Sequence, residues 1–178
     1  ADLEAQFALA MKVHAKLTET HETINAIRAL KKQLDLWDAR AKEQGQSRLL
    51  TSSGSLRRKA SAIEEELVQV KAKSRQDTLN YPAKLNAKLA GLLGSVGGAD
   101  FAPTQGMQDV YADLARRIDA QIRKWDALAS DIQTFDRAVR SSGMPAVGSG
   151  AVKRRTGGTR GTRARAARGR VRRKATGP

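Results

Sequence analysis

Apolar side chains recur every three or four residues, or at multiples of those steps, from the start of the chain to Gly45. The series comprises Leu3, Phe7, Ala10, Leu17, Ile24, Ile27, Leu30, Leu34, Trp37 and Ala41. This spacing is typical of one face of an α-helix and is close to a coiled-coil heptad. Gly45 stands where a C-terminal glycine is expected. We therefore predict a helix over residues 2–44, and partner helices must cover it because a lone rod of roughly 60 Å is unstable in water.

A second periodic segment covers about residues 56–93, after a stretch at 45–55 that we interpret as a connection. Its apolar positions are Leu56, Ala60, Ile63, Leu67, Val70, Tyr81, Leu85, Leu89 and Leu92. Pro82 lies inside this segment and lacks a backbone donor, so it interrupts helical hydrogen bonding. We predict a helix over 56–93 with a kink or short break near Asn80–Tyr81.

The third segment, about residues 104–142, follows a linker at 94–103 and has the most regular pattern. Its apolar positions are Met107, Val110, Leu114, Ile118, Ile122, Trp125, Leu128, Ile132, Phe135 and Val139. Thr104 is suited to cap the first turn, and Gly143 and Pro145 end the helix. Three acid-first pairs at i,i+4 support its exposed side, namely Asp113–Arg117, Asp119–Arg123 and Asp136–Arg140.

Three apolar stripes of nearly matched length, joined by connections of about ten residues, predict an all-α fold. The expected architecture is an antiparallel three-long-helix bundle, up-down-up and coiled-coil-like, over residues 1–147. Trp37 and Trp125 stand at positions that face the centre of such a bundle, so we expect both in the core. No apolar run approaches the ~18–20 residues that cross a bilayer.

Charge separates the last part of the chain from the rest. Of the 33 Lys and Arg residues, 11 lie in 151–178, where there is no Asp or Glu, so residues 1–150 have 22 against 18 acids and a net charge of only +4. A basic block without counter-charges self-repels and stays solvated, so we predict a disordered tail over 148–178. Its candidate polyanion-binding residues are Arg154, Arg155, Arg160, Arg163, Arg165, Arg168, Arg170, Arg172 and Arg173. No aromatic residue is interleaved for base stacking, so binding would be sequence-blind.

The two histidines, His14 and His21, continue the first apolar stripe seven residues apart. That spacing is about 10 Å along a helix, whereas ligands of one metal ion each lie ~2 Å from it. We expect both to be partly buried and to help fix the helix register. A pH-sensitive stripe is the alternative, because neutral histidine is easier to bury than its cation.

Other residues with chemical potential lack a recognisable constellation. Glu64, Glu65 and Glu66 are consecutive, and we interpret them as a solvated face. The serines near residue 53 have no nucleophile-elbow motif, and the glycines near residue 94 lack a following Lys-Ser/Thr. The absence of cysteine excludes disulfides and thiolate metal sites. We therefore expect no catalytic, cofactor-binding or metal-binding residues and no enzymatic activity.

The run LNYPAKLNAKL at 79–89 is the most distinctive motif, with Ala99-Asp100, Pro103-Thr104 and the closing SGMPAV at 142–147. With these features, residues 1–147 resemble the C-terminal helical region of bacterial sortilin-like proteins. Those proteins carry BNR (Asp-box) repeats that form β-propellers, and they are often labelled glycosyl hydrolases. The motif residues are Asn80, Tyr81, Pro82, Leu85 and Asn86, and we expect the two asparagines to satisfy backbone groups freed at the proline.

The resemblance implies a helical accessory element that follows a propeller, with any ligand-binding or hydrolytic surface on the propeller itself. It also implies a secreted, periplasmic or cell-envelope setting. The chain starts inside a periodic segment, which we interpret as a cut within a longer protein. The basic tail departs from the family pattern, and either a genuine extension or a reading-frame shift accounts for it.

Two functions follow as hypotheses. The first is a non-catalytic helical module that serves packing, oligomerisation or partner docking next to an upstream propeller of the same parent protein. The alternative is polyanion or nucleic-acid binding through the tail, with the helices as a scaffold.

Overall fold

The computed structural model describes residues 2–98 and 101–143, and within these ranges it is all-helical without a strand. The elements are α1 (Asp2–Glu43), α2 (Ser47–Leu67), the short 3-10 helix η1 (Arg75–Leu79), α3 (Leu85–Gly97) and α4 (Gln105–Ser141). The prediction of an all-α fold is therefore confirmed. The prediction of three long helices is wrong, because four α-helices form in the described part of the chain.

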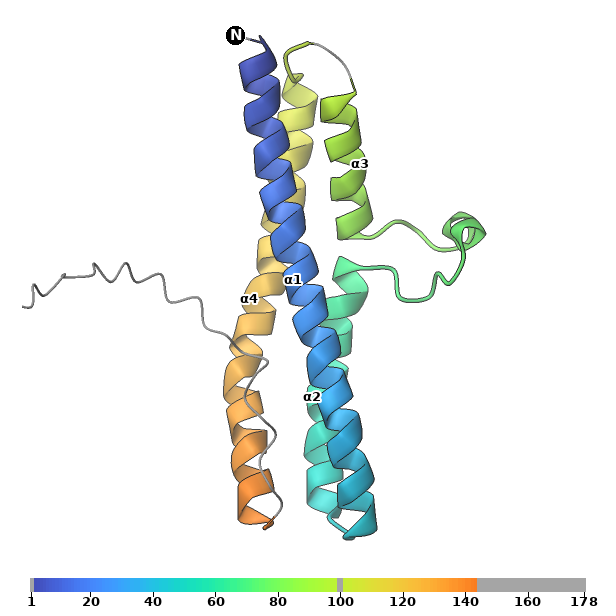
Figure 1. The fold of residues 1–178 in the computed structure, drawn as a ribbon, viewed down its shortest axis with the longest axis vertical. Helices are drawn as coiled ribbons and strands as arrows, with labels where there is room; N and C mark the ends of the chain where they lie inside the picture. The colour runs from blue at the N-terminus through green and yellow to red at the C-terminus, as the bar shows by residue number, and fades with distance from the viewer. Residues whose placement is uncertain (1, 99–100, 144–178) are drawn as a thin grey trace, which may run out of the picture.

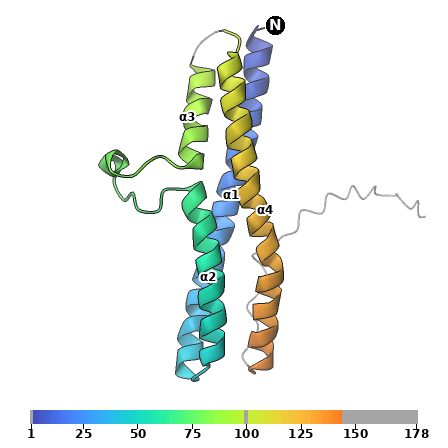
Figure 2. The ribbon, with the colours of Figure 1, turned by 180° about the vertical axis from the view of Figure 1, so that it is seen from behind.

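The four helices make one elongated assembly (Figure 1). The chain runs along α1 and returns along α2, which lies beside the C-terminal half of α1. It continues along α3, which lies beside the N-terminal half of α1, and then reverses into α4, which spans the whole length. Seen from behind, α4 passes in front of α1, with α2 and α3 beside it (Figure 2). Helices α2 and α3 thus share the place expected for one helix.

The chain reverses after α1 within a few residues. The Gln46 N–H donates to Ala41 O at 2.8 Å and the Gly45 N–H to Lys42 O at 3.2 Å, with Gly45 at a φ of +64°. These two bonds and the left-handed glycine are a Schellman C-terminus, as the position of Gly45 predicted. The predicted connection at 45–55 is wrong, however, because α2 already begins at Ser47. Leu49, Ser53 and Leu56 are all buried at helical spacing, so the small polar residues between them lie on the helix.

The second predicted helix is interrupted over a much longer stretch than a kink near Asn80–Tyr81. Helix α2 ends at Leu67, and Val68 has an extended backbone with φ −136° and ψ 147°. The connection that follows projects away from the helices and contains η1 (Figures 1 and 2). Its polar residues supply no apolar face to hold a helix against α1, which explains why the interruption begins well before Pro82.

Buried apolar side chains from all four α-helices form one core. Trp37 lies in it, as expected, whereas Trp125 is only partly buried against it. At the start of α4 the Thr104 hydroxyl accepts from the Met107 N–H at 3.2 Å, so the predicted N-cap is confirmed. Gly143, at a φ of +76°, follows the end of α4, and Pro145 lies outside the described residues.

The face that α1 turns towards the core differs from the predicted one in its N-terminal half. The core-facing positions follow a regular 4-3 spacing and comprise Leu9, Val13, Lys16, Thr20, Thr23, Ile27, Leu30, Leu34, Trp37 and Ala41. The predicted stripe is displaced from them: its first residues, Leu3 and Phe7, are exposed. Ala10 and Leu17 are partly buried, and Ile24 is buried as predicted. Two heptad patterns overlap along this half of α1, and the more apolar one is not the one that packs inside.

Candidate interaction surfaces

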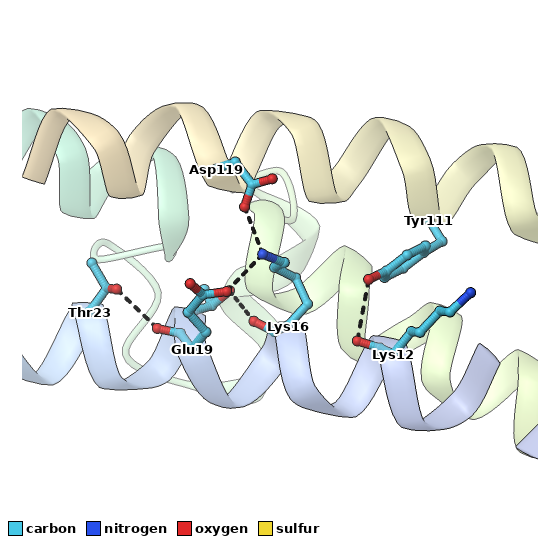
Figure 3. Close-up of polar contacts among 7 residues, drawn as sticks. Lys12, Lys16, Glu19, Thr23, Tyr111 and Asp119 are labelled. Atoms are coloured by element: carbon cyan, nitrogen blue, oxygen red, sulfur yellow. Dashed lines mark hydrogen bonds and ion pairs between the residues drawn. The ribbon is translucent and has the colours of Figure 1, made fainter. Parts of the chain in front are cut away.

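Polar contacts join α1 to α4 in the N-terminal half of the assembly (Figure 3). Lys16 Nζ donates to Asp119 Oδ1 at 2.6 Å and to Glu19 Oε2 at 2.7 Å. Burial by itself would lower the pKa of Lys16, but the hydrogen bonds to Asp119 and Glu19 outweigh it and raise that pKa above its ordinary value. The core position of Lys16 is therefore occupied by a charged, fully paired ammonium group.

Two threonines add to the polar residues on the core-facing side of α1. The Thr20 hydroxyl donates to Lys16 O at 2.7 Å, and the Thr23 hydroxyl donates to Glu19 O at 2.9 Å. Both are buried, and both satisfy their hydroxyl groups on their own helix. The inner side of α1 is thus unusually polar over this half.

One flank of the same half, about 120° around α1 from the core-facing positions, is apolar and faces solvent. Six residues at 4-3 spacing, which we name the outer stripe of α1, line it: Leu3, Phe7, Ala10, His14, Leu17 and His21. Leu3 is 62% and Phe7 67% exposed, and the neighbouring Met11 is 51% exposed. Ala10 and Leu17 are partly buried. The stripe contains no Asp, Glu, Lys or Arg, so it is an uncovered apolar helix face.

Both histidines belong to the outer stripe of α1 and are exposed. The expectation that they are partly buried is therefore wrong. The reason is the displaced register of the core stripe, which gives the inward positions to Lys16 and Thr20 instead. A pH-sensitive bundle core at His14 and His21 is excluded on the same ground.

Helix α3 also has two stripes. Leu85, Leu89, Leu92 and Val96 are buried against the core. The outer stripe of α3, again at heptad spacing, comprises Ala87, Ala90, Gly94 and Gly97, all of them exposed. A Cβ added at Gly94 or Gly97 would meet nothing within 4 Å, and neither residue has a positive φ. Neither the backbone nor the packing within the chain therefore requires glycine at these positions.

A buried carboxylate lies between α1 and α2. Glu64 Oε1 accepts from Arg28 Nε at 2.8 Å, and Glu64 Oε2 accepts from Lys31 Nζ at 2.7 Å. Burial would raise the pKa of Glu64, but the hydrogen bonds from Lys31 and Arg28 outweigh it and hold that pKa below its ordinary value. The interpretation of Glu64–Glu66 as a solvated face is therefore wrong for Glu64 and holds for the exposed Glu65 and Glu66.

The residues of the distinctive motif lie around the start of α3. Asn80, Tyr81 and Pro82 are exposed in the connection, Leu85 is buried as the first residue of α3, and Asn86 is partly buried. Pro82 O accepts a hydrogen bond from Gln69 Nε2 at 3.0 Å. This bond ties the motif back to the residues that follow α2.

Asp77 organises the same connection. Its Oδ2 accepts from the Lys73 N–H at 2.7 Å and from the Ser74 N–H at 2.9 Å, and a reciprocal capping box with Ser74 starts η1. Backbone hydrogen bonds from Lys73 and Ser74 lower the pKa of Asp77. The sequence reasoning missed both Gln69 and Asp77, although Ser74 followed by Asp77 is a recognisable N-cap pattern.

Within residues 2–98 and 101–143, no group of three or more His, Asp or Glu side chains is placed to hold a metal ion. A shallow hollow of about 200 Å³ lies between α2 and α4, beside Ser52 and Ser55. Its charged groups, Lys59 and Asp131, pair with each other at 2.6 Å. Ser53 is buried instead.

The basic residues from Arg154 to Arg173 lie outside the described residues. None of the helices in the described ranges has the length and apolar character that crossing a bilayer requires. Comparison with protein-family models, with curated proteins and with solved structures found no match.

Proposed function

We propose that this chain is a non-catalytic helical interaction module that belongs to a sortilin-like, BNR-repeat propeller protein. In this role it packs against an upstream propeller, mediates oligomerisation or docks a partner. A coiled-coil-like association of its helices suits each of these tasks. The observation that carries the proposal is the outer stripe of α1, where Leu3 and Phe7 are more than half exposed beside a polar inner face.

The physical support is the distribution of polarity across α1. An isolated helical domain gains stability when its more apolar face is buried, yet here Lys16, Thr20 and Thr23 face inwards and the apolar stripe faces outwards. A contiguous apolar face of this kind marks a site of protein association. The link to the propeller family rests on the LNYPAKLNAKL run at 79–89 and on the PA motif at 145–146.

The coding sequence upstream of Ala1 tests the family assignment. Asp-box repeats in the same reading frame would support it, and a start codon immediately upstream would contradict it. If repeats are present, the propeller made as a separate protein should bind the full chain in a calorimetric titration. The Phe7→Glu variant should weaken that binding wherever the propeller uses the outer stripe of α1.

Polyanion binding through the tail is the second candidate, favoured by the 11 Lys and Arg residues without an acid in 151–178. Release of counterions would make such binding steeply salt-dependent, with a slope approaching about −10 if all the charges met duplex DNA. The test compares the full chain with a chain ending at residue 147, on duplex DNA at two salt concentrations. Equal binding by both chains would exclude the tail as the cause.

A further inference from the structure

The outer stripes of α1 and α3 face the same side of the molecule. Helices α1 and α3 pack on each other, and Ala10 and Leu17 on α1 and Leu93 on α3 are partly buried against the core. Beyond these positions both helices turn an exposed stripe outwards. In the upper half of Figure 1 the two helices lie side by side, and Figure 2 shows α4 on the opposite side. The two stripes therefore form one continuous face.

The two halves of this face differ in size but not in charge. The outer stripe of α1 carries bulky side chains, with Phe7 and Leu3 the most exposed. The outer stripe of α3 carries only alanine and glycine. Neither stripe contains a charged residue, so a charged partner surface finds nothing to pair with. The face therefore consists of bulky side chains along α1 next to small side chains along α3.

We propose that a second copy of this chain covers this face. In the resulting two-fold dimer, the outer stripe of α1 from each copy packs on the outer stripe of α3 from the other. This inference deepens the proposed function, on which it rests, by naming the partner of the interaction module.

The geometry of the two helices makes the face self-complementary. Gln6 Nε2 donates to Val96 O at 2.7 Å, which places the N-terminal part of α1 beside the C-terminal part of α3, with the helices antiparallel. A two-fold axis that lies in the plane of contact and runs parallel to the helices exchanges the places of α1 and α3 and keeps their directions. The bulky stripe of one copy then lies along the small stripe of the other, and the two helices run antiparallel, as α1 and α3 do within one chain. Such an isologous contact buries both stripes at once.

A glycine of α3 provides independent support. Glycine is unfavourable in a helix interior, yet Gly94 lies inside α3 with open space around it and without a positive φ. Within one chain, alanine would serve equally well there. Close approach of a helix from outside supplies the missing reason, because the absence of a Cβ lets bulky side chains such as Phe7 reach the backbone.

The first experiment measures the mass of the full chain by sedimentation equilibrium over a concentration series from about 1 µM to about 1 mM. The expected result is a reversible rise to twice the 19.3 kDa of one chain. Phe7→Glu should raise the dimer Kd at least about tenfold, because the new carboxylate would lie in an interface that excludes water. Leu36→Glu is the matched control, since Leu36 is also 67% exposed but lies outside the stripe. Its Kd should not change.

A second pair of variants tests the α3 side. Ala90→Arg places a long cation on the outer stripe, whereas Ser95→Arg places the same cation at an exposed position about 120° around the helix from the middle of that stripe. Only the first should weaken the dimer. Circular dichroism melts check that every variant remains folded, which both exposed positions predict.

Cross-linking tests the orientation, and the absence of cysteine in the chain makes single-cysteine variants clean reporters. A mixture of Phe7→Cys and Ala90→Cys chains should form a mixed product with a short bis-maleimide, in excess of either homodimer. Products formed only between identical chains would overturn the pairing of α1 with α3. A wild-type chain that stays monomeric throughout, or a Phe7→Glu chain that dimerises normally, would overturn the dimer itself. The upstream-sequence and propeller-binding tests would then still decide the proposed function separately.

Discussion

Lys16 and Asp119 join the two longest helices through a 2.6 Å contact between Lys16 Nζ and Asp119 Oδ1. Lys16 occupies an inward heptad position between Val13 and Thr20, where an aliphatic residue is usual, and only 17% of its side chain is exposed. Asp119 is 41% exposed, so water screens the pair on one side. The contact therefore fixes how α1 and α4 are aligned and adds little net stability.

The first prediction concerns substitutions of Lys16. Lys16→Met should change the free energy of unfolding by less than about 1 kcal/mol, because the apolar stem is kept and both carboxylates can reach water. Lys16→Glu should destabilise the fold by roughly 1–3 kcal/mol, because a third carboxylate would join Glu19 and Asp119. Urea denaturation measures both. A large loss of stability in Lys16→Met would show that the ion pair itself holds the helices together.

The second prediction concerns Glu64, whose pKa is lowered in the folded chain. A depressed folded pKa adds stability above the unfolded value near 4.5, and this contribution is lost as the pH falls through the folded pKa. Glu64→Gln should therefore lower the free energy of unfolding by about 1–2 kcal/mol at pH 7. This loss is smaller than for breaking a fully buried ion pair, because Arg28 is half exposed. The difference from the wild type should shrink towards zero as the pH falls below 4.

The control for Glu64 is its neighbour. Glu65 is exposed, so Glu65→Gln should change the free energy of unfolding by less than about 0.5 kcal/mol at every pH. Urea denaturation of the three proteins across the pH range makes the comparison. Identical pH dependence in the wild type and in Glu64→Gln would contradict the assignment of the buried ion pairs.

Sequence periodicity predicted α4 almost to the residue, because a single apolar stripe runs through it between a threonine cap and a glycine stop. It failed in the first half of α1, where Phe7 and Val13 belong to two different heptad patterns and the more apolar pattern faces outwards. Periodicity alone cannot choose between two such faces, because the choice depends on what the neighbouring helices present. Lys16 is paired by Asp119, which lies far away in sequence.

Two other features were hidden for similar reasons. The sequence predicts a connection where α2 begins, since serine and glycine disfavour helices locally, but burial of Leu49 and Leu56 overrides that preference. Glu64 looks like its two neighbours in sequence. Only the helix rotation set by Ile63 and Leu67 reveals that it points towards Arg28 and Lys31 on α1.

The third prediction compares two glycines. Gly45 has a φ of +64° and closes the Schellman turn, so Gly45→Ala should lower the free energy of unfolding by about 1 kcal/mol. Gly91 is helical, and a Cβ there meets nothing within 4 Å. Gly91→Ala should therefore stabilise the fold by about 0.5–1 kcal/mol. Thermal melts at one protein concentration give both values, and equal signs for the two substitutions would contradict the local structure.

The fourth prediction uses limited proteolysis to test the projecting connection between α2 and α3. Leu79 is 89% exposed at the end of η1, whereas Leu36 is 67% exposed in the C-terminal part of α1. Proteases require an extended segment, so exposure within a helix is not enough. Chymotrypsin should cut after Leu79 well before it cuts after Leu36, as followed by mass spectrometry. The two fragments should stay together on a sizing column, because α1 packs on both α2 and α3. Fragments that separate at once would show that α3 and α4 depend on the intact connection.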